Sequence, residues 1–319
     1  MPENNSKNSK NQTILYASAF LAVLLWASAF PATRYALEYY SPVSLMVMRF
    51  SAASITLGIV GLIKRINLPK LKDVPLFIAS GLSGVLLYSY LFNTGSVTVP
   101  AGVSSFIISS APIFTLILTW IFLKETAKPL CLIGIAISIC GLAAVTLFQT
   151  TEFTFDIGLI LVILAAISSG IYSMIMRVLT KKYTALEATT YTIIIGTIGT
   201  LIFLPNAISE MPSSTLSVNL LVLFMGVFPA ALAYLAWSFA LAKAHKTVHV
   251  TVFSYLIPFI SALIAFLWLH ETLSLFTLTG GLVIIAGMII TNVFDKKAKK
   301  EDNSADTSDS SNTFSEERK

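Results

Sequence analysis

Apolar residues run along this chain in ten stretches of about 20 residues, separated by short polar segments. Each stretch is long enough to cross a hydrocarbon core of roughly 30 Å as an α-helix. The predicted spans are 14–33, 42–63, 74–94, 99–123, 130–149, 157–179, 188–208, 218–241, 248–269 and 274–294. The pattern therefore predicts an all-α polytopic membrane protein with ten transmembrane helices.

The second half of the chain repeats features of the first half at a constant offset of 146 residues. The repeated positions are Pro112 with Pro258, Glu125 with Glu271, Gly134 with Gly280, and Gly141 with Gly287. Because each half holds five spans, an odd number, the second copy starts on the opposite face of the membrane. The fold is therefore predicted to be two inverted five-helix repeats, an arrangement that places a substrate path between the halves.

Five segments follow from this division. We expect a cytoplasmic tail (1–13), a first repeat (14–149), an external linker (150–156), a second repeat (157–294) and a disordered cytoplasmic tail (295–319).

Composition and charge support a membrane location and fix its orientation. Hydrophobic residues make up 55% of the chain and charged residues 12%. Sixteen basic residues fall in the tails and loops on one side of the ten-span model, whereas the opposite loops hold only Arg34. The positive-inside rule then predicts a multi-pass protein of the cytoplasmic (inner) membrane with both termini in the cytoplasm. The net charge of +5 indicates this topology and not nucleic-acid binding.

Several motifs resemble the EamA-type exporters of the drug/metabolite transporter superfamily. They are Leu25-Trp26-Ala27-Ser28-Ala29-Phe30, Met48-Arg49-Phe50, and the two copies of the proline, glutamate and glycine pattern. The resemblance covers residues 14–294, with Ser169 where the family often has a tryptophan in the sixth span. It implies a transporter that exports amino acids or other metabolites, or imports some of them, and it does not identify the substrate.

Arg49 is the strongest single candidate for a functional residue. It lies about seven residues into the second span, roughly 10 Å deep, where a charge is costly unless it faces a polar cavity or a partner. It could bind a substrate carboxylate or phosphate, act as an outer gate, or serve structurally by capping carbonyl groups. No Asp or Glu is deep in any span, which argues against a buried-carboxylate proton relay.

Hydroxyl and aromatic side chains in four spans could line a central cavity for a small amphiphilic solute. These candidates are Tyr88, Tyr90, Asn93, Ser104, Ser105, Tyr234, Trp237, Ser238, Thr251, Ser254 and Tyr255. Alternatively, the serines allow close helix packing and the aromatic residues form belts at the membrane interface.

The repeated prolines and the repeated glutamates each allow two interpretations of their role. Pro112 and Pro258 remove backbone hydrogen bonds inside predicted helices, so they could be hinges or could only shape the bundle. Glu125 and Glu271 stand at helix ends, where they could take part in gating or satisfy backbone groups and nearby cations.

We therefore predict a secondary transporter that exports amino acids or related compounds by alternating access. An organophosphate or nucleotide-sugar exchanger of the same superfamily is the alternative, although such substrates need several deep cations. A membrane-embedded enzyme acting on lipid is a further alternative, and we predict that the chain is not an enzyme. The expected partners are a small-molecule substrate and the lipid bilayer, with no cofactor, no metal, and a monomer or weak homodimer.

Overall fold

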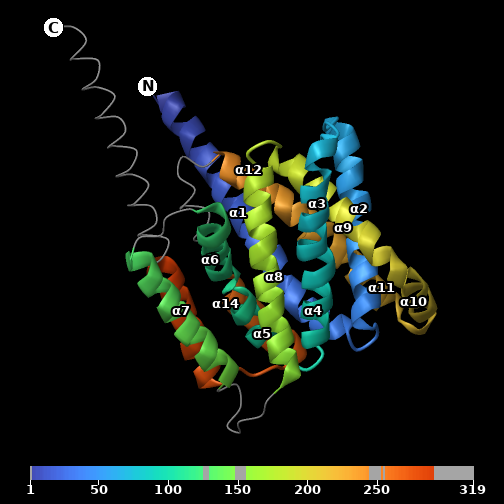
Figure 1. Ribbon diagram of the computed structural model, residues 1–319, viewed down its shortest axis with the longest axis vertical. Coiled ribbons are helices and arrows are strands. Elements are labelled where there is room, and N and C mark those ends of the chain that lie inside the picture. Colours follow the sequence, from blue (N-terminus) through green and yellow to red (C-terminus); the bar gives the residue numbers. More distant parts are fainter. Residues whose placement is uncertain (1, 125–128, 148–155, 244–252, 254–255, 291–319) are drawn as a thin grey trace, which may run out of the picture.

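A computed structural model describes residues 2–124, 129–147, 156–243, 253 and 256–290, and no strand occurs among them. The chain is a bundle of helices (Figure 1), which confirms the predicted all-α fold. The predicted tail 295–319, and the predicted linker 150–156 except for its last residue, lie outside the described residues. The helix of the first span begins at Pro2, inside the predicted tail 1–13.

The first repeat contains these elements in chain order: α1 (Pro2–Ala36), α2 (Pro42–Lys64), η1 (Leu71–Asp73), α3 (Val74–Gly81), η2 (Leu82–Leu87), α4 (Tyr88–Gly95), α5 (Ala101–Ile108), α6 (Ala111–Leu123) and α7 (Pro129–Leu147). The elements η1 to α4 stack into the third predicted span, and α5 with α6 forms the fourth.

The second repeat follows the same plan. Its elements are α8 (Ile157–Leu179), α9 (Ala185–Thr200), η3 (Leu201–Phe203), α10 (Leu204–Glu210), η4 (Met211–Ser213), α11 (Leu216–Val227), η5 (Phe228–Leu232), α12 (Ala233–Lys243), α14 (Ile257–Leu269) and an unlabelled helix, Leu275–Ile290.

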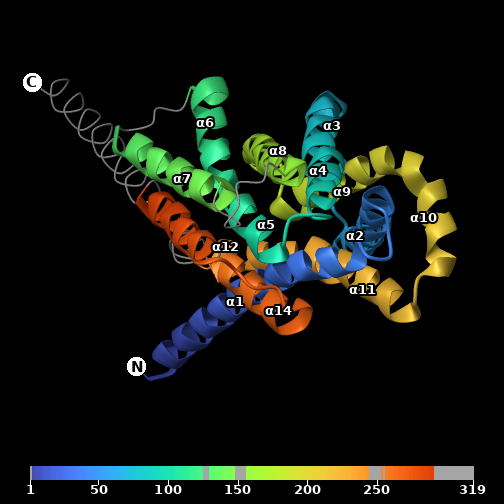
Figure 2. The ribbon, with the colours of Figure 1, turned by 90° about the horizontal axis from the view of Figure 1, so that it is seen from below.

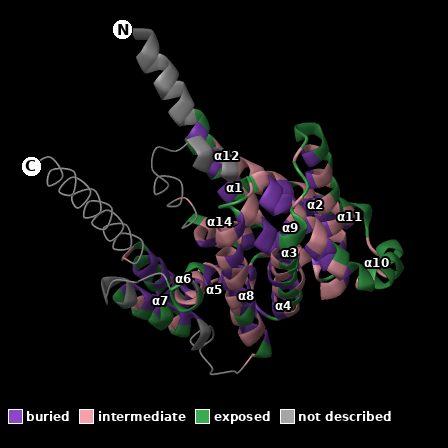
Figure 3. Ribbon diagram, turned by 45° about the horizontal axis from the view of Figure 1, so that its top comes forward, coloured by how far each residue is buried: buried purple, intermediate pink, exposed green. Residues whose placement is uncertain are grey.

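The described helices account for all ten predicted spans. Seven are long and apolar enough to cross a membrane, and three shorter apolar helices match the fifth, ninth and tenth spans. Large apolar side chains point outward, as at Leu62 (80% exposed), Leu267 (66%) and Ile121 (58%). Figure 3 shows buried positions where helices face one another. A soluble protein would not expose so much apolar surface, so lipid covers these faces.

The bundle has two ends, which we name by residues that lie there. The Arg34 side holds the end of α1 and the starts of α2, α5 and α8, and the Lys64 side holds the ends of α2, α6 and α8. Gly95 and Gly158 meet on the Arg34 side, where a Cβ on Gly95 would lie 2.7 Å from the Gly158 carbonyl oxygen.

Equivalent points of the two repeats lie on opposite sides. Both α6 and α14 end in a left-handed residue, Lys124 (φ 51°) and His270 (φ 54°). The Glu271 carboxylate, next to His270, accepts a hydrogen bond from the Ala101 N–H at 2.8 Å. Ala101 begins the span that ends at Lys124, so His270 lies at the Arg34 side while its counterpart lies at the Lys64 side. The repeats are therefore inverted.

One helix irregularity recurs in both repeats, and a second lies in the fourth span. The π-helical turns η2 and η5 begin at Leu82 and Phe228, which are equivalent positions of the third and eighth spans. The fourth span is interrupted between α5 and α6, and Pro112 stands in the first turn of α6, as Pro258 does in α14. Pro112 therefore follows a break in its span instead of kinking a continuous helix, because proline fits the first turn, where its missing N–H is no loss.

The repeated glycines explain how the fifth and tenth spans meet. In Figures 1 and 2, α7 and the helix Leu275–Ile290 lie side by side at one edge of the bundle, opposite α10. The Ser138 hydroxyl donates to the Ile284 carbonyl at 3.0 Å. A Cβ on Gly141 would lie 2.7 Å from the Gly280 carbonyl oxygen, and one on Gly287 would lie 2.5 Å from that of Gly134. The four glycines thus permit one symmetric backbone contact.

We expect Gly141→Ala and Gly287→Ala to destabilise the protein by about 1–3 kcal/mol each, the usual cost of overpacking. The added methyl would meet backbone atoms, which cannot move aside as a flexible side chain can. Thermal unfolding in detergent measures the effect. Gly58→Ala is the matched control, because a Cβ there would meet nothing within 4 Å. Equal stability of all three variants would contradict the close crossing.

Candidate functional site

A cavity of about 690 Å³ lies inside the bundle, between helices of both repeats. Side chains from α1, α2, α4, α6, α8 and α12 line it, together with residues of η2 and η5. Its volume is within the range of about 300–1,000 Å³ that suits small-molecule sites.

The helix irregularities make room for this cavity. Gly84 and Val85 of η2 and Pro229 and Ala230 of η5 line it, so both π-helical turns contribute to its wall. Such turns widen a helix locally and often occur at functional sites. Pro112 lines it where α5 gives way to α6, so the break in the fourth span also contributes to the wall.

Arg49 is the most unusual residue of the lining. Its guanidinium lies 5.5 Å from the centroid of the Phe50 ring, and Tyr88 and Tyr234 are close enough to interact with it electrostatically. Its buried Nε has no hydrogen-bond partner, and no carboxylate among the described residues forms an ion pair with it. A buried cation left in this state is costly, so the site favours an anionic group that enters from the cavity.

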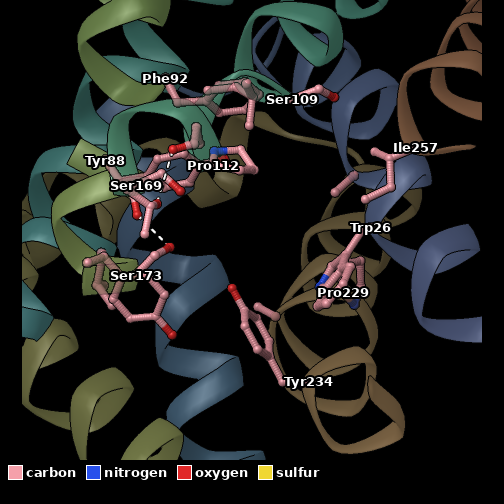
Figure 4. A pocket seen from close by; sticks show the side chains of 18 of the residues that line it. Trp26, Tyr88, Phe92, Ser109, Pro112, Ser169, Ser173, Pro229, Tyr234 and Ile257 are labelled. Atoms are coloured by element: carbon pink, nitrogen blue, oxygen red, sulfur yellow. Dashed lines mark hydrogen bonds between the residues drawn. The ribbon is translucent and has the colours of Figure 1, made fainter. Parts of the chain in front are cut away.

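Aromatic side chains form one wall of the cavity. Trp26 lies 5.3 Å from Tyr234 and 5.2 Å from Trp237, measured between ring centroids. In Figure 4, Trp26 and Tyr234 face Ser169 and Ser173 of α8 across the open space. The cavity is thus mostly apolar, with a few hydroxyl groups and one unpaired cation, a combination typical of sites for small amphiphilic molecules.

The cavity extends toward the Lys64 side, and aromatic rings bound it toward the Arg34 side. It extends to Arg177, which lies two residues before the end of α8 on the Lys64 side. Toward the Arg34 side, Phe30 packs edge-on against Phe92 at 5.5 Å, and Tyr88 stacks on Phe92 at 5.7 Å. These rings form an aromatic floor between the cavity and the Arg34 side.

Beyond that floor, Glu271 joins the two repeats. Its carboxylate accepts from Ala101 N–H and lies 3.8 Å from the Arg34 guanidinium. Partial burial raises the pKa of Glu271 above its usual value, and the hydrogen bond from Ala101 and the charge of Arg34 offset only part of that rise. Ala101 and Arg34 therefore both favour the ionised form of this carboxylate.

The structure brings together part of the predicted set. Arg49, Tyr88, Tyr234, Trp237 and Pro112 line the cavity. Ser238 has no described side chain, and Thr251, Ser254, Tyr255 and Glu125 lie outside the described residues.

Five other predicted residues are not in the cavity lining. Tyr90 is 43% exposed on the outer face. The Asn93 amide donates to the Pro42 carbonyl at 3.0 Å, and the Ser105 hydroxyl donates to the Gly102 carbonyl at 2.6 Å. Ser104 is buried in α5, and Pro258 is buried in α14. Of these residues, Asn93 joins α4 to the start of α2, and the Ser105 hydroxyl bonds within α5.

Helix α8 contributes lining residues that were not among the predicted site residues. Ser169, Tyr172 and Ser173 line the cavity, and a Cβ on Gly84 would lie 2.3 Å from the Tyr172 ring, so that glycine provides the space in which the ring packs. The signal was present, because the run 168–173 interrupts an otherwise apolar span with serines and a tyrosine. Trp26 was noted only as part of a motif.

Comparison with known proteins places the chain in a family context. A model of the EamA-like transporter family matches residues 13–147 and again residues 156–293. An uncharacterized transporter of Bacillus subtilis, YdfC, is 33% identical over 91% of this chain and 95% of its own length. A probable terminal-alkyne amino-acid exporter of Streptantibioticus cattleyicolor is 32% identical over 85% of this chain and 91% of its own.

A solved crystal structure also has the same fold. It superposes with a TM-score of 0.61 over 88% of this chain and 96% of its own, at 17% sequence identity. At that identity the likeness concerns the fold alone.

Proposed function

The chain belongs to the EamA-like transporter family, and from that premise we propose that it exports amino acids or related carboxylates by alternating access. Members of this family are membrane transporters and not enzymes, so a lipid-modifying activity is excluded.

The observation that carries the proposal is the buried Arg49 guanidinium, whose Nε has no hydrogen-bond partner and which has no ion pair among the described residues. A planar guanidinium can bind a carboxylate through two parallel hydrogen bonds, which would supply the partner that Arg49 lacks. The apolar lining around it, including Phe50, Val85 and Trp26, suits a solute with an apolar body. An apolar amino acid or a related monocarboxylate has both parts.

The similarity to a named exporter supports the same solute class. The Streptantibioticus cattleyicolor relative is described as a probable terminal-alkyne amino-acid exporter, and the alignment covers 85% of this chain and 91% of the relative. Its terminal-alkyne substrate is a property of that protein, and only the broader class of amino acids and related compounds enters the proposal here.

The charge pattern supports the orientation of the cavity that export requires. The loops on the Lys64 side carry the basic residues, so the positive-inside rule puts that side in the cytoplasm of a cell bounded by the cytoplasmic membrane. The cavity would then be accessible from the cytoplasm in the present conformation and closed toward the outside. This is the state in which an exporter loads its solute.

One observation favours the organophosphate alternative. Arg177 is a second cation in the lining, and a phosphorylated solute requires more than one. Arg177, however, lies near the end of α8 and already interacts with another part of the protein, so Arg49 alone is an unpaired cation in the described lining.

An untargeted metabolite comparison tests the proposal. Cells that produce the chain are compared with cells that produce equal amounts of the Arg49→Ala variant, with medium and cytoplasm measured by mass spectrometry. We expect apolar amino acids or related monocarboxylates to accumulate in the medium only with the unaltered chain. Accumulation of phosphorylated compounds would favour the alternative, and identical media would contradict the proposal.

A further inference from the structure

A small polar network ties the two repeats together on the Arg34 side. The Glu271 carboxylate, which follows α14, accepts a hydrogen bond from Ala101 N–H at 2.8 Å. Its other oxygen lies 3.8 Å from Arg34 Nε at the end of α1. Arg34 Nη1 in turn donates to the Val97 carbonyl at 2.6 Å, in the segment before α5. One carboxylate and one guanidinium thus connect α14 of the second repeat to three segments of the first.

The network lies where the cavity is closed. Beneath it are Phe30 and Phe92, which form the aromatic floor with Tyr88. Nearby, Tyr35 of α1 packs on Trp268 of α14, with ring centroids 5.3 Å apart. Separation of α14 from α1 and α5 would open a path to the Arg34 side, and it would break the contacts of Glu271 with Ala101 and Arg34 and the contact of Tyr35 with Trp268.

The side chains of this network are held in the protein and not in open solvent. The Glu271 side chain is 16% exposed and the Arg34 side chain 33% exposed. A charge-assisted contact in such surroundings is stronger than an ion pair at a surface, and removal of one partner leaves the other charge partly buried and unpaired.

We propose that Arg34 and Glu271, with the Val97 carbonyl and the Ala101 N–H, form a latch that closes the cavity on the Arg34 side and must release before the solute can leave there. The latch rests on alternating access but not on the identity of the solute. Its position predicts that weakening it shifts the protein toward states open on the Arg34 side.

Labelling of a cysteine in the cavity tests this latch without any substrate. The reporter is Ser109→Cys, at a residue that lines the cavity between α5 and α6, in a chain in which Cys131 and Cys140 are replaced by alanine. A membrane-impermeant maleimide is applied to vesicles in either orientation, so that each side is probed separately. Without further change, the maleimide should label the reporter cysteine rapidly from the Lys64 side and slowly from the Arg34 side.

Glu271→Ala should raise the reaction rate from the Arg34 side roughly tenfold or more, the size expected for loss of one hydrogen bond to a charged group. Arg34→Ala should act in the same direction. Glu271→Gln should have a smaller effect, because its amide oxygen can still accept from Ala101 N–H while it carries no charge for Arg34.

Glu210→Ala is the matched control. The Glu210 carboxylate accepts from Ser41 N–H at 2.8 Å at the start of α2, so it caps a helix on the same side without joining α14 to α1. Size-exclusion profiles in detergent verify folding. If Glu271→Ala fails to accumulate, the labelling rates of Arg34→Ala and Glu271→Gln test the latch instead. Unchanged rates in the latch variants, or an equal rise in Glu210→Ala, would overturn the proposal.

Discussion

Replacing Arg49 with alanine is expected to weaken carboxylate binding by roughly 10–150-fold while the folded protein stays intact. The loss corresponds to about 1.5–3 kcal/mol for hydrogen bonds to a charged group. Stability should not fall, because the Arg49 Nε has no hydrogen-bond partner and the guanidinium has no ion pair among the described residues. Removing a buried cation that lacks a partner relieves a cost instead of creating one. Isothermal titration with an apolar amino acid, together with thermal unfolding, measures both effects.

Two further substitutions at this position separate charge from shape. Arg49→Lys keeps the charge but loses the planar fork, so binding should recover only in part. Arg49→Met keeps the length without charge and should bind as poorly as the alanine variant. If Arg49→Ala unfolds the protein, or binds the solute as well as the unaltered chain does, the guanidinium is structural and the proposed recognition is wrong.

Replacing both Pro112 and Pro258 with alanine is expected to slow transport at least tenfold while binding is largely kept. Proline keeps α5 and α6 separate, because a helix that continued through Pro112 would carry an interior proline at a cost of about 3 kcal/mol or more, and alanine removes that cost. A change of that size in the relative energy of bent and straight segments corresponds to roughly 100-fold in their populations. Turnover in proteoliposomes and binding in detergent give the two readouts.

Pro205→Ala is the control for this pair. Pro205 also stands in the first turn of a helix, but in α10, at the edge of the bundle and outside the cavity lining. Its replacement should leave turnover unchanged. Normal turnover in the double variant would remove the hinge hypothesis and leave the prolines a role in shaping the bundle only.

The fold could be predicted from the sequence because lipid imposes simple requirements. Each span must be long and apolar, and the ten stretches satisfy this requirement. The constant offset between the proline, glutamate and glycine positions predicted the repeat, and the left-handed residues Lys124 and His270 occupy equivalent positions in the structure. The π-helical turns η2 and η5 were not predicted, because an extra residue within one helical turn leaves no clear mark in hydrophobic periodicity.

The break before Pro112 could have been predicted more sharply. Proline is tolerated in the first turn of a helix and disfavoured in its interior, and here Ser109 and Ser110 precede Ala111 and Pro112. Proline at the start of a second helix was therefore a better prediction than proline inside a kinked one.

For the site, charge and position were more informative than residue type. Arg49 could be singled out because a deep charge has few explanations. Tyr88 and Tyr90 could not both line a cavity, since residues two apart on a helix do not face the same way, and the structure places only Tyr88 in the lining. Ser104 could not be assigned from sequence, because serine serves helix packing and cavity lining equally well.

Solute exchange in proteoliposomes tests the central claim most directly. Vesicles containing the purified protein are loaded with an unlabelled apolar amino acid, and the entry of the same labelled compound is followed. If the inverted repeats expose the Arg49 cavity to one side at a time, the internal solute should accelerate labelled entry, and Arg49→Ala should remove the acceleration. Entry at the same rate with and without internal solute would contradict the account.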